Sequence, residues 1–259
     1  MAKPLRLLFP HLWSNARPNS DFCRNNKLTA CHIIKTLASK DFRFNNNVST
    51  KLVAKSLRDT DVIISVVRHN PTFPWGHIWP LAFNCYLDNK LKDFQWRLVH
   101  KALCTGAKIH GWGMGSGICP MANCNCIETI EHIFWECPKV NSIILWLKAF
   151  CKSFNANFNL NVSFFLMGFP RINMPKVVFN RLWYVLCVSK FIIWKSRCIH
   201  VFQSHAHSSE EIQSLIINYI KQRVRADKCR LPKDEFEKVW TRKRSFVSLC
   251  GEKVYFKFV

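Results

Sequence analysis

The chain has 259 residues, of which 49% are apolar, so it can bury one large or two modest cores and is not a disordered tail. Its 38 basic and 16 acidic side chains give a formal net charge of +22, which favours binding to a polyanion such as RNA, DNA or an anionic membrane surface. The thirteen cysteines are odd in number and mostly scattered singly, which argues against the disulfide framework of a small secreted protein. We therefore expect an intracellular, reducing location, with the nucleus as one candidate, and no cleavable signal peptide in the proline-interrupted N-terminal segment.

Three regions are expected in chain order. Residues 1–75 mix basic side chains with Asn-rich turns and two Pro-containing stretches, which predicts a basic, partly irregular N-terminal region. Residues 76–152 contain an amphipathic helix followed by a cluster of cysteines. Residues 153–259 have the apolar spacing of a helical C-terminal region.

The segment 87–103 predicts an amphipathic helix with a basic outer face. Its basic residues fall outside a single apolar stripe that has the spacing of one helix face. A Gly-rich segment, residues 111–117, then ends regular structure and leads into the cysteine cluster. The apolar stripe consists of Leu87, Leu91, Phe94, Leu98 and Ala102.

Two further helices are expected with identifiable caps. The segment 141–150 has apolar residues at core spacing, and either Asn141 or Ser142 is the expected cap. The segment 208–226 starts at Ser208 or Ser209, carries glutamates in its first turn and ends in basic residues, as the helix dipole favours.

The apolar segment 177–202 is long enough to be mistaken for a membrane span. Polar and charged residues interrupt it, however, and an intramembrane charge is costly. We therefore expect a buried helix of the core and no association with a membrane. The interrupting residues are Asn180, Arg181, Lys190 and Lys195.

Residues 119–138, with the sequence CPMANCNCIETIEHIFWECP, place four cysteines and one histidine within twenty positions. Zinc prefers a tetrahedral site of thiolates and imidazoles, with two ligands on a tight turn and two on the following element. One ligand set is Cys119, Cys124, His132 and Cys137, and the alternative replaces Cys124 with Cys126. Both are sterically feasible, and the Gly and Pro residues around Cys119, which already provide a turn, favour Cys124. The expected fold is thus mainly α, with a small CCHC-like zinc-knuckle insertion.

The second half of this cluster needs a break in its helix. Thr129 can cap a short helix, on which His132 and Cys137 would point about 140° apart at ~100° per residue. Two side chains so placed do not share one ion. Pro138 removes the conflict, because a residue that precedes proline is disfavoured in the α region and Cys137 is free to turn back.

These residues resemble the reverse-transcriptase zinc-binding domain, which follows the polymerase in proteins of LINE-type, non-LTR retrotransposons. The resemblance covers residues 78–147 and its pieces occur in the family's order. The family often has two residues between its first two cysteines, whereas this chain has four; the distance from Cys124 to His132 is the usual one, and the role of Cys126 stays open. The matching residues are Phe94, Trp96, Arg97, Leu98 and His100; Thr105 and Gly106; Cys119 and Pro120; Glu128, Thr129 and His132; and Cys137 and Pro138.

The chain lacks the residues that a polymerase needs. A reverse-transcriptase palm holds two magnesium ions on paired aspartates, and no Asp-Asp pair occurs in this sequence. The nearest imitation, Asp59 and Asp61, fits a solvated turn or a helix start. No P-loop, nucleophile elbow or zinc-protease helix is present either.

The resemblance implies a non-enzymatic zinc protein, either a C-terminal fragment or a domesticated remnant of a LINE-type element. The basic composition predicts RNA or DNA as partner, mainly through phosphates, while exposed tryptophans would stack on unpaired bases. The alternative is a structural zinc module that binds a protein partner and no nucleic acid. The residues expected to contact phosphates are Lys90, Lys92, Arg97, Lys101, Lys108 and Lys139.

Overall fold

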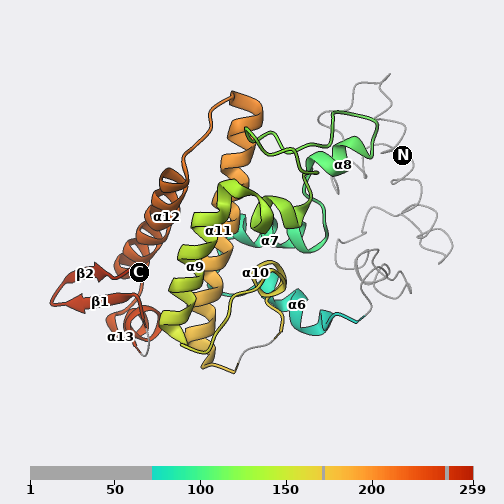
Figure 1. Cartoon of the computed structure of the whole chain (residues 1–259). Helices are drawn as coiled ribbons and strands as arrows, with labels where there is room; N and C mark the ends of the chain where they lie inside the picture. The colour runs from blue at the N-terminus through green and yellow to red at the C-terminus, as the bar shows by residue number, and fades with distance from the viewer. Residues whose placement is uncertain (1–71, 171–172, 243–244, 259) are drawn as a thin grey trace, which may run out of the picture. The chain divides into compact units, whose positions relative to one another are not determined.

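The computed structural model describes residues 72–170, 173–242 and 245–258 (Figure 1). All described residues belong to one compact unit, His69–Val259. The expected irregular region over residues 1–75, with Asp59 and Asp61, therefore lies outside the described residues except for residues 72–75.

Helices make up most of the described chain, which confirms the prediction of a mainly α fold. Near the C-terminus, β1 (Val247–Cys250) and β2 (Lys253–Phe256) form an antiparallel hairpin. In chain order the helical elements are α6 (Trp75–Ala82), α7 (Asn89–Val99), α8 (Gly106–His110), the π-helical turn η1 (His132–Glu136), the 3₁₀ turn η2 (Pro138–Val140), α9 (Asn141–Phe154), α10 (Val162–Met167), α11 (Lys176–Gln203), α12 (Ser209–Arg230), α13 (Lys233–Phe236) and the π-helical turn η3 (Glu237–Thr241).

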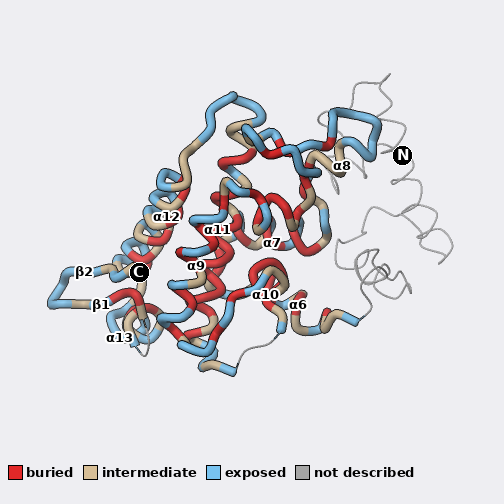
Figure 2. Tube along the Cα trace, viewed as in Figure 1, coloured by how far each residue is buried: buried red, intermediate tan, exposed pale blue. Residues whose placement is uncertain are grey.

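The 28-residue helix α11 is the centre of the core. It contacts α7, α9, α12, η1 and η3, and it runs through the middle of the described unit (Figure 1). By length and composition it could cross a membrane, but 78% of its most apolar stretch is buried inside the protein (Figure 2). A helix that is apolar on all sides needs neighbours on all sides. The prediction of a buried helix over residues 177–202 is therefore confirmed.

The charged residues inside α11 are satisfied by neighbouring elements. Lys190 is fully buried, donates to the side-chain oxygen of Gln95 at 2.7 Å and lies 4.2 Å from the ring centre of Trp183. Burial lowers the pKa of Lys190 to about 8. Arg181 is also buried and donates to the main-chain carbonyls of Trp240 and Arg242. A buried polar group without such partners would be costly, so these contacts fix α7 and η3 against α11.

Helix α7 is shorter than predicted. It starts at Asn89 because the Asp88 side chain accepts the main-chain N–H of Leu91 at 3.0 Å. It ends at Val99 because Lys101 adopts a left-handed conformation with φ of 52°. The N–H of Lys101 then bonds to the Leu98 carbonyl and the N–H of Ala102 to the Arg97 carbonyl, which is a Schellman ending. Lysine stands here where glycine is usual, so the sequence carried no stop signal.

The expected cap of α9 is wrong. The helix begins at Asn141 directly after the 3₁₀ turn η2, and the residue at its N-cap position, Val140, makes no side-chain cap hydrogen bond. Pro138 starts the helical path three residues early, so Asn141 is already inside the helix. The cap expected for α12 is confirmed at Ser208, which forms a reciprocal capping box with Glu211.

The C-terminal hairpin was not expected from the sequence. Its signal is present, since Val247, Leu249, Val254 and Phe256 alternate with polar residues around Gly251. The strands pair Val247 with Phe256 and Cys250 with Lys253, and Gly251 has the positive φ that the tight turn requires. Each strand has only four residues, so its alternating pattern is a weak signal beside the longer helical pattern around it.

Candidate metal centre

We define the knuckle as residues 117–138. Its first half is a short antiparallel loop. Ile118 pairs with Ile127, and the N–H of Cys119 donates to the carbonyl of Cys126 at 2.9 Å. Asn123 has a φ of 62°, a left-handed conformation that asparagine tolerates, and it turns the chain immediately before Cys124. The loop therefore returns on itself and buries the thiols of Cys119 and Cys124.

The second half is helical but not α-helical around the ligands. Thr129 caps it, since its hydroxyl accepts the N–H of His132 at 3.0 Å. The N–H of Cys137 then bonds to the carbonyl of His132 at 2.9 Å, the i to i+5 bond of a π-helical turn. Cys137 itself has an extended backbone, with φ of −63° and ψ of 128°, as expected for a residue before Pro138. The wider turn and the extended backbone of Cys137 together bring the side chains of His132 and Cys137 to the same side of the turn.

Four side chains meet where the two halves of the knuckle face each other. The ligand atoms of Cys119, Cys124, His132 and Cys137 all lie within 4.8 Å of one another, and all four residues are buried. The sulfurs of Cys119 and Cys137 are 4.0 Å apart, and the sulfur of Cys124 is 3.3 Å from Nε2 of His132. A tetrahedral zinc site with zinc–sulfur bonds of about 2.3 Å has sulfur–sulfur edges of about 3.8 Å. The cluster has the size and the donor set that zinc requires.

Burial disfavours the charged form of two thiols of the cluster when no metal is bound. Burial raises the pKa of the Cys119 thiol to about 12, and burial raises the pKa of Cys137 as well. These two buried thiols are therefore protonated at neutral pH unless a positive charge compensates them. A bound zinc ion would supply that charge, hold the thiols as thiolates and close the knuckle.

Cys126 has a different position from the other three cysteines of the knuckle. Its main-chain carbonyl accepts from Cys119, but its side chain is exposed and does not belong to the buried cluster. Of the two candidate second ligands, the structure brings Cys124 to the cluster and leaves Cys126 at the surface.

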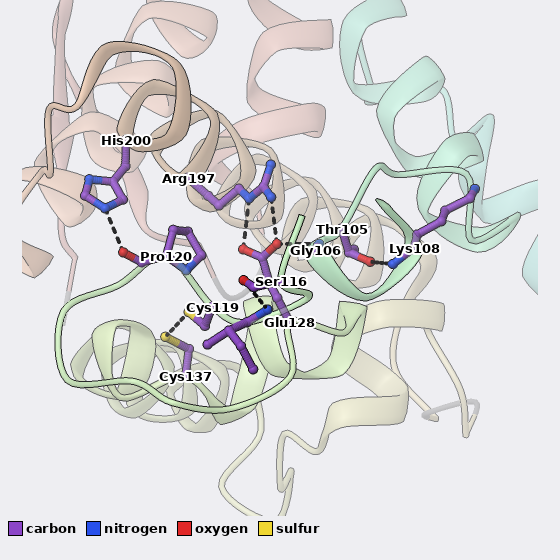
Figure 3. A network of polar contacts seen from close by, with 11 residues as sticks. Thr105, Gly106, Lys108, Ser116, Cys119, Pro120, Glu128, Cys137, Arg197 and His200 are labelled. Carbon is purple, nitrogen blue, oxygen red and sulfur yellow. Dashed lines mark hydrogen bonds and ion pairs between the residues drawn. The ribbon is translucent and has the colours of Figure 1, made fainter. Parts of the chain in front are cut away.

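A buried ion pair fastens the knuckle to α11 (Figure 3). The guanidinium of Arg197 donates to the carboxylate of Glu128 at 2.9 and 2.6 Å, and both side chains are almost fully buried. Glu128 also accepts the N–H of Gly106 at 2.6 Å, and its carbonyl accepts the N–H of Ala107. One residue of the knuckle thus holds α11 and the start of α8. Bidentate geometry of this kind is the strong form of a carboxylate–guanidinium contact.

A second contact from α11 lies on the outer loop of the knuckle. Nε2 of His200 is 3.0 Å from the carbonyl of Pro120, next to the ligand candidate Cys119 (Figure 3). Arg197 and His200 are three residues apart and so lie on one face of α11. Sequence analysis did not identify either residue as part of the site. The available signal was the closely spaced basic residues Lys195, Arg197 and His200 near the end of the long helix.

The six predicted phosphate contacts fall into two groups. Five come from α7, its C-terminal end and α8, whereas Lys139 lies in η2, after the last ligand in the chain. Lys108 donates to the carbonyl of Lys101 at 2.9 Å, which joins the end of α7 to α8. Arg97 forms a surface ion pair with Asp93 at 2.9 Å, so part of its charge is compensated. Lys90 and Lys101 are exposed.

Comparison with known proteins places this site in a family. Residues 64–146 match a family model described as zinc-binding in reverse transcriptase. The chain is also 24% identical over 119 residues to the Transposon TX1 uncharacterized 149 kDa protein of Xenopus laevis, a match that covers 46% of this chain and 9% of that protein. No solved structure matches the chain. The chain therefore contains a reverse-transcriptase zinc-binding domain, matched over residues 64–146, and its described part carries a buried cluster of Cys119, Cys124, His132 and Cys137 suited to holding the metal.

Proposed function

We propose that this chain is a non-catalytic zinc protein, derived from a LINE-type reverse transcriptase, that binds RNA or DNA mainly through phosphates. The family match and the retrotransposon relative support the origin, and the buried cluster supports the metal. The net charge of +22 supports a polyanionic partner. An intracellular, reducing location belongs to the same proposal, because thiol ligands must stay reduced to bind zinc.

The observation that carries nucleic-acid binding is the connection between the knuckle and the basic segment. Glu128, in the knuckle, accepts N–H groups of Gly106 and Ala107 at the start of α8. Lys108, in the same helix, contacts the carbonyl of Lys101 at the end of α7. An ordered knuckle therefore holds two lysines in fixed positions. Phosphate contacts of this kind give affinity without sequence specificity.

The non-catalytic part of the proposal depends on the sequence. The chain has no Asp-Asp pair, and the matched segment belongs to a zinc-binding family model and not to a polymerase model. Two-metal phosphoryl transfer needs carboxylates that hold both ions. We expect the purified protein to show no primer extension with magnesium or manganese.

The test is nucleic-acid binding by zinc-loaded protein over a series of salt concentrations. If phosphates are neutralised, the logarithm of the binding constant should fall linearly with the logarithm of the salt concentration, by roughly 0.7 per contact on a single strand. The variant Lys101→Ala with Lys108→Ala should have a shallower slope by about one to two contacts. A binding constant that does not respond to salt would contradict the proposal.

A structural module that binds a protein partner is the second candidate. It is favoured by the exposed apolar side chains of the knuckle loop and the Gly-rich turn. Ile127 is 63% exposed and Trp112 is 54% exposed, and Ile118, which pairs with Ile127, is also exposed. Ile118 and Ile127 are cross-strand neighbours, and exposed apolar neighbours are typical of contact sites. A complex with a protein that survives high salt, together with no binding to nucleic acid, would favour this candidate.

A further inference from the structure

Helices α6 and α7 carry a continuous row of stacked aromatic rings. Trp75 and Trp79 are four residues apart on α6, and Trp96 and His100 are four residues apart at the end of α7, so each pair lies on one helix face. The two helices contact each other and join the pairs. We call the row the aromatic ladder. Its ring-centre distances are 5.8 Å from Phe73 to Trp75, 4.9 Å from Trp75 to Trp79, 4.7 Å from Trp79 to His100 and 4.2 Å from His100 to Trp96.

Two neighbouring ring pairs of the aromatic ladder are stacked and two, including His100 with Trp96, are tilted. Successive planes differ by 37° or less. Burial lowers the pKa of His100, so its imidazole is uncharged at neutral pH and presents a π surface. Offset stacking at these separations is favourable for aromatic rings. The inner rings therefore hold the outer one in a fixed orientation.

The outer ring of the aromatic ladder is open to solvent. Trp96 is 42% exposed although its neighbours Trp75 and Trp79 are buried or half-buried. An indole that served only to pack one helix on another would be buried, as Trp75 is. Trp96 instead stacks on His100 and leaves a large part of its surface uncovered. Exposure of a large ring on a rigid support is what a stacking platform requires, because little side-chain entropy is lost when a ligand binds.

The charges around the open ring suit a phosphate backbone. Lys92 lies one helical turn before Trp96 on the same face, and Lys101 follows His100 directly. The one acidic side chain close by on α7, Asp93, is paired with Arg97. Proteins that bind single strands combine such basic side chains with aromatic rings on which bases stack.

We propose that the aromatic ladder is a stacking platform on which an unpaired base of a single-stranded nucleic acid extends the row beyond Trp96. The inference rests on the proposed nucleic-acid binding and names its form: a single strand, bound by stacking at Trp96 and by phosphate contacts at Lys92 and Lys101. A duplex keeps its bases stacked internally and offers no free face to the ring. The same chemistry applies to RNA and DNA.

The experiment measures the affinity of zinc-loaded protein for a labelled oligothymidine strand that is longer than the ~4–16 nucleotides such modules cover. Trp96→Ala should weaken binding roughly five- to a hundredfold, the range that follows from one lost base–aromatic stack. The slope of affinity against salt should not change, because stacking releases no counterions. Trp96→Phe should retain most of the affinity, whereas Trp96→Leu, which is apolar without a π face, should not.

Two controls locate the effect. Tyr255→Ala removes an aromatic ring that is 51% exposed and lies on β2, outside the aromatic ladder, so it should change affinity less than twofold. An abasic strand of the same length keeps the phosphates and lacks the bases. The abasic strand should bind the native protein more weakly than oligothymidine does. The Trp96→Ala variant should bind the two strands equally well.

The outcomes separate this inference from the proposed function. Salt-dependent binding that Trp96→Ala leaves unchanged, or equal losses in Trp96→Ala and Tyr255→Ala, would overturn the stacking platform and leave phosphate binding in place. Equal affinity for the abasic and the thymidine strands would overturn it as well. Binding to neither a single strand nor a duplex would overturn both.

Discussion

At the scale of single residues, the position of each thiol decides its role. Cys119, Cys124 and Cys137 are buried in the cluster, whereas Cys126, two residues after Cys124, is exposed. Asn123, with its left-handed backbone, turns the chain just before Cys124, so the loop does not keep the two-residue period of a strand, which would put both thiols on one face. Composition does not distinguish Cys124 from Cys126, but the direction of the side chain does.

The first prediction separates these two thiols. Cys124→Ser should lower zinc affinity strongly, since a hydroxyl is a poor zinc ligand, while Cys126→Ser should leave it nearly unchanged. Competition with a coloured chelator measures both affinities, and cobalt substitution reports whether the site stays tetrahedral. Equal losses in the two variants would mean that both thiols share the site.

At the scale of secondary-structure elements, the ion pair of Glu128 and Arg197 connects the knuckle to α11. Both side chains are almost fully buried, and the carboxylate also holds the start of α8. A buried pair contributes little net stability when whole, but the removal of one partner leaves an uncompensated charge. Removal of one partner therefore lowers the free energy of unfolding by more than the intact pair adds to it.

The second prediction tests this coupling. Glu128→Gln should destabilise the fold by about 3–5 kcal/mol, because Arg197 is then buried without a partner. Adding Arg197→Met should restore much of that loss, because the buried charge is gone. Urea unfolding of the two single variants and the double variant gives the interaction energy. Asp93→Asn, which breaks the exposed pair with Arg97, is the matched control and should cost less than about 1 kcal/mol. Additive effects at positions 128 and 197 would show that the two residues act separately.

At the scale of the whole molecule, zinc and the apolar core stabilise different parts. The helices around α11 bury a large set of apolar side chains far from the ligands, including Trp183, Phe150 and Ile216. In the first half of the knuckle, residues 117–127, the buried side chains are the thiols of Cys119 and Cys124, and small modules of this kind depend on their metal to fold. We therefore expect the metal to control the knuckle and α8, and the core to control the remaining helices.

The third prediction follows from this division. Zinc removal by a chelator should leave most of the helical far-UV circular dichroism intact, while amide protons of the knuckle and α8 lose protection from hydrogen exchange. Nucleic-acid affinity at a fixed salt concentration should fall, because Lys101 and Lys108 lose their fixed positions. Re-addition of zinc should restore both properties. Complete loss of helical signal would show instead that the whole unit depends on the metal.

Some features of this protein follow from the sequence alone. The spacing of cysteines and histidine, the helical periodicity and the capping box at Ser208 are local patterns, and local patterns depend on residues close in the chain. They predicted the mainly α fold, the zinc cluster and the buried character of residues 177–202. Pro138 also predicted the extended backbone of Cys137, since a proline restricts the residue before it.

Other features were decided only by the tertiary structure, because they join residues far apart in the chain. Glu128 and Arg197 are 69 positions apart, and nothing near either residue indicates its partner. The π-helical turn brings His132 and Cys137 together. An α-helical turn would follow a closely related backbone path, and the packing of this turn on α11 selects between the two. The aromatic ladder likewise exists only because α6 and α7 pack together. The sequence by itself determined the types of side chain and their local spacing, and the packing of helices around α11 determined which of them meet.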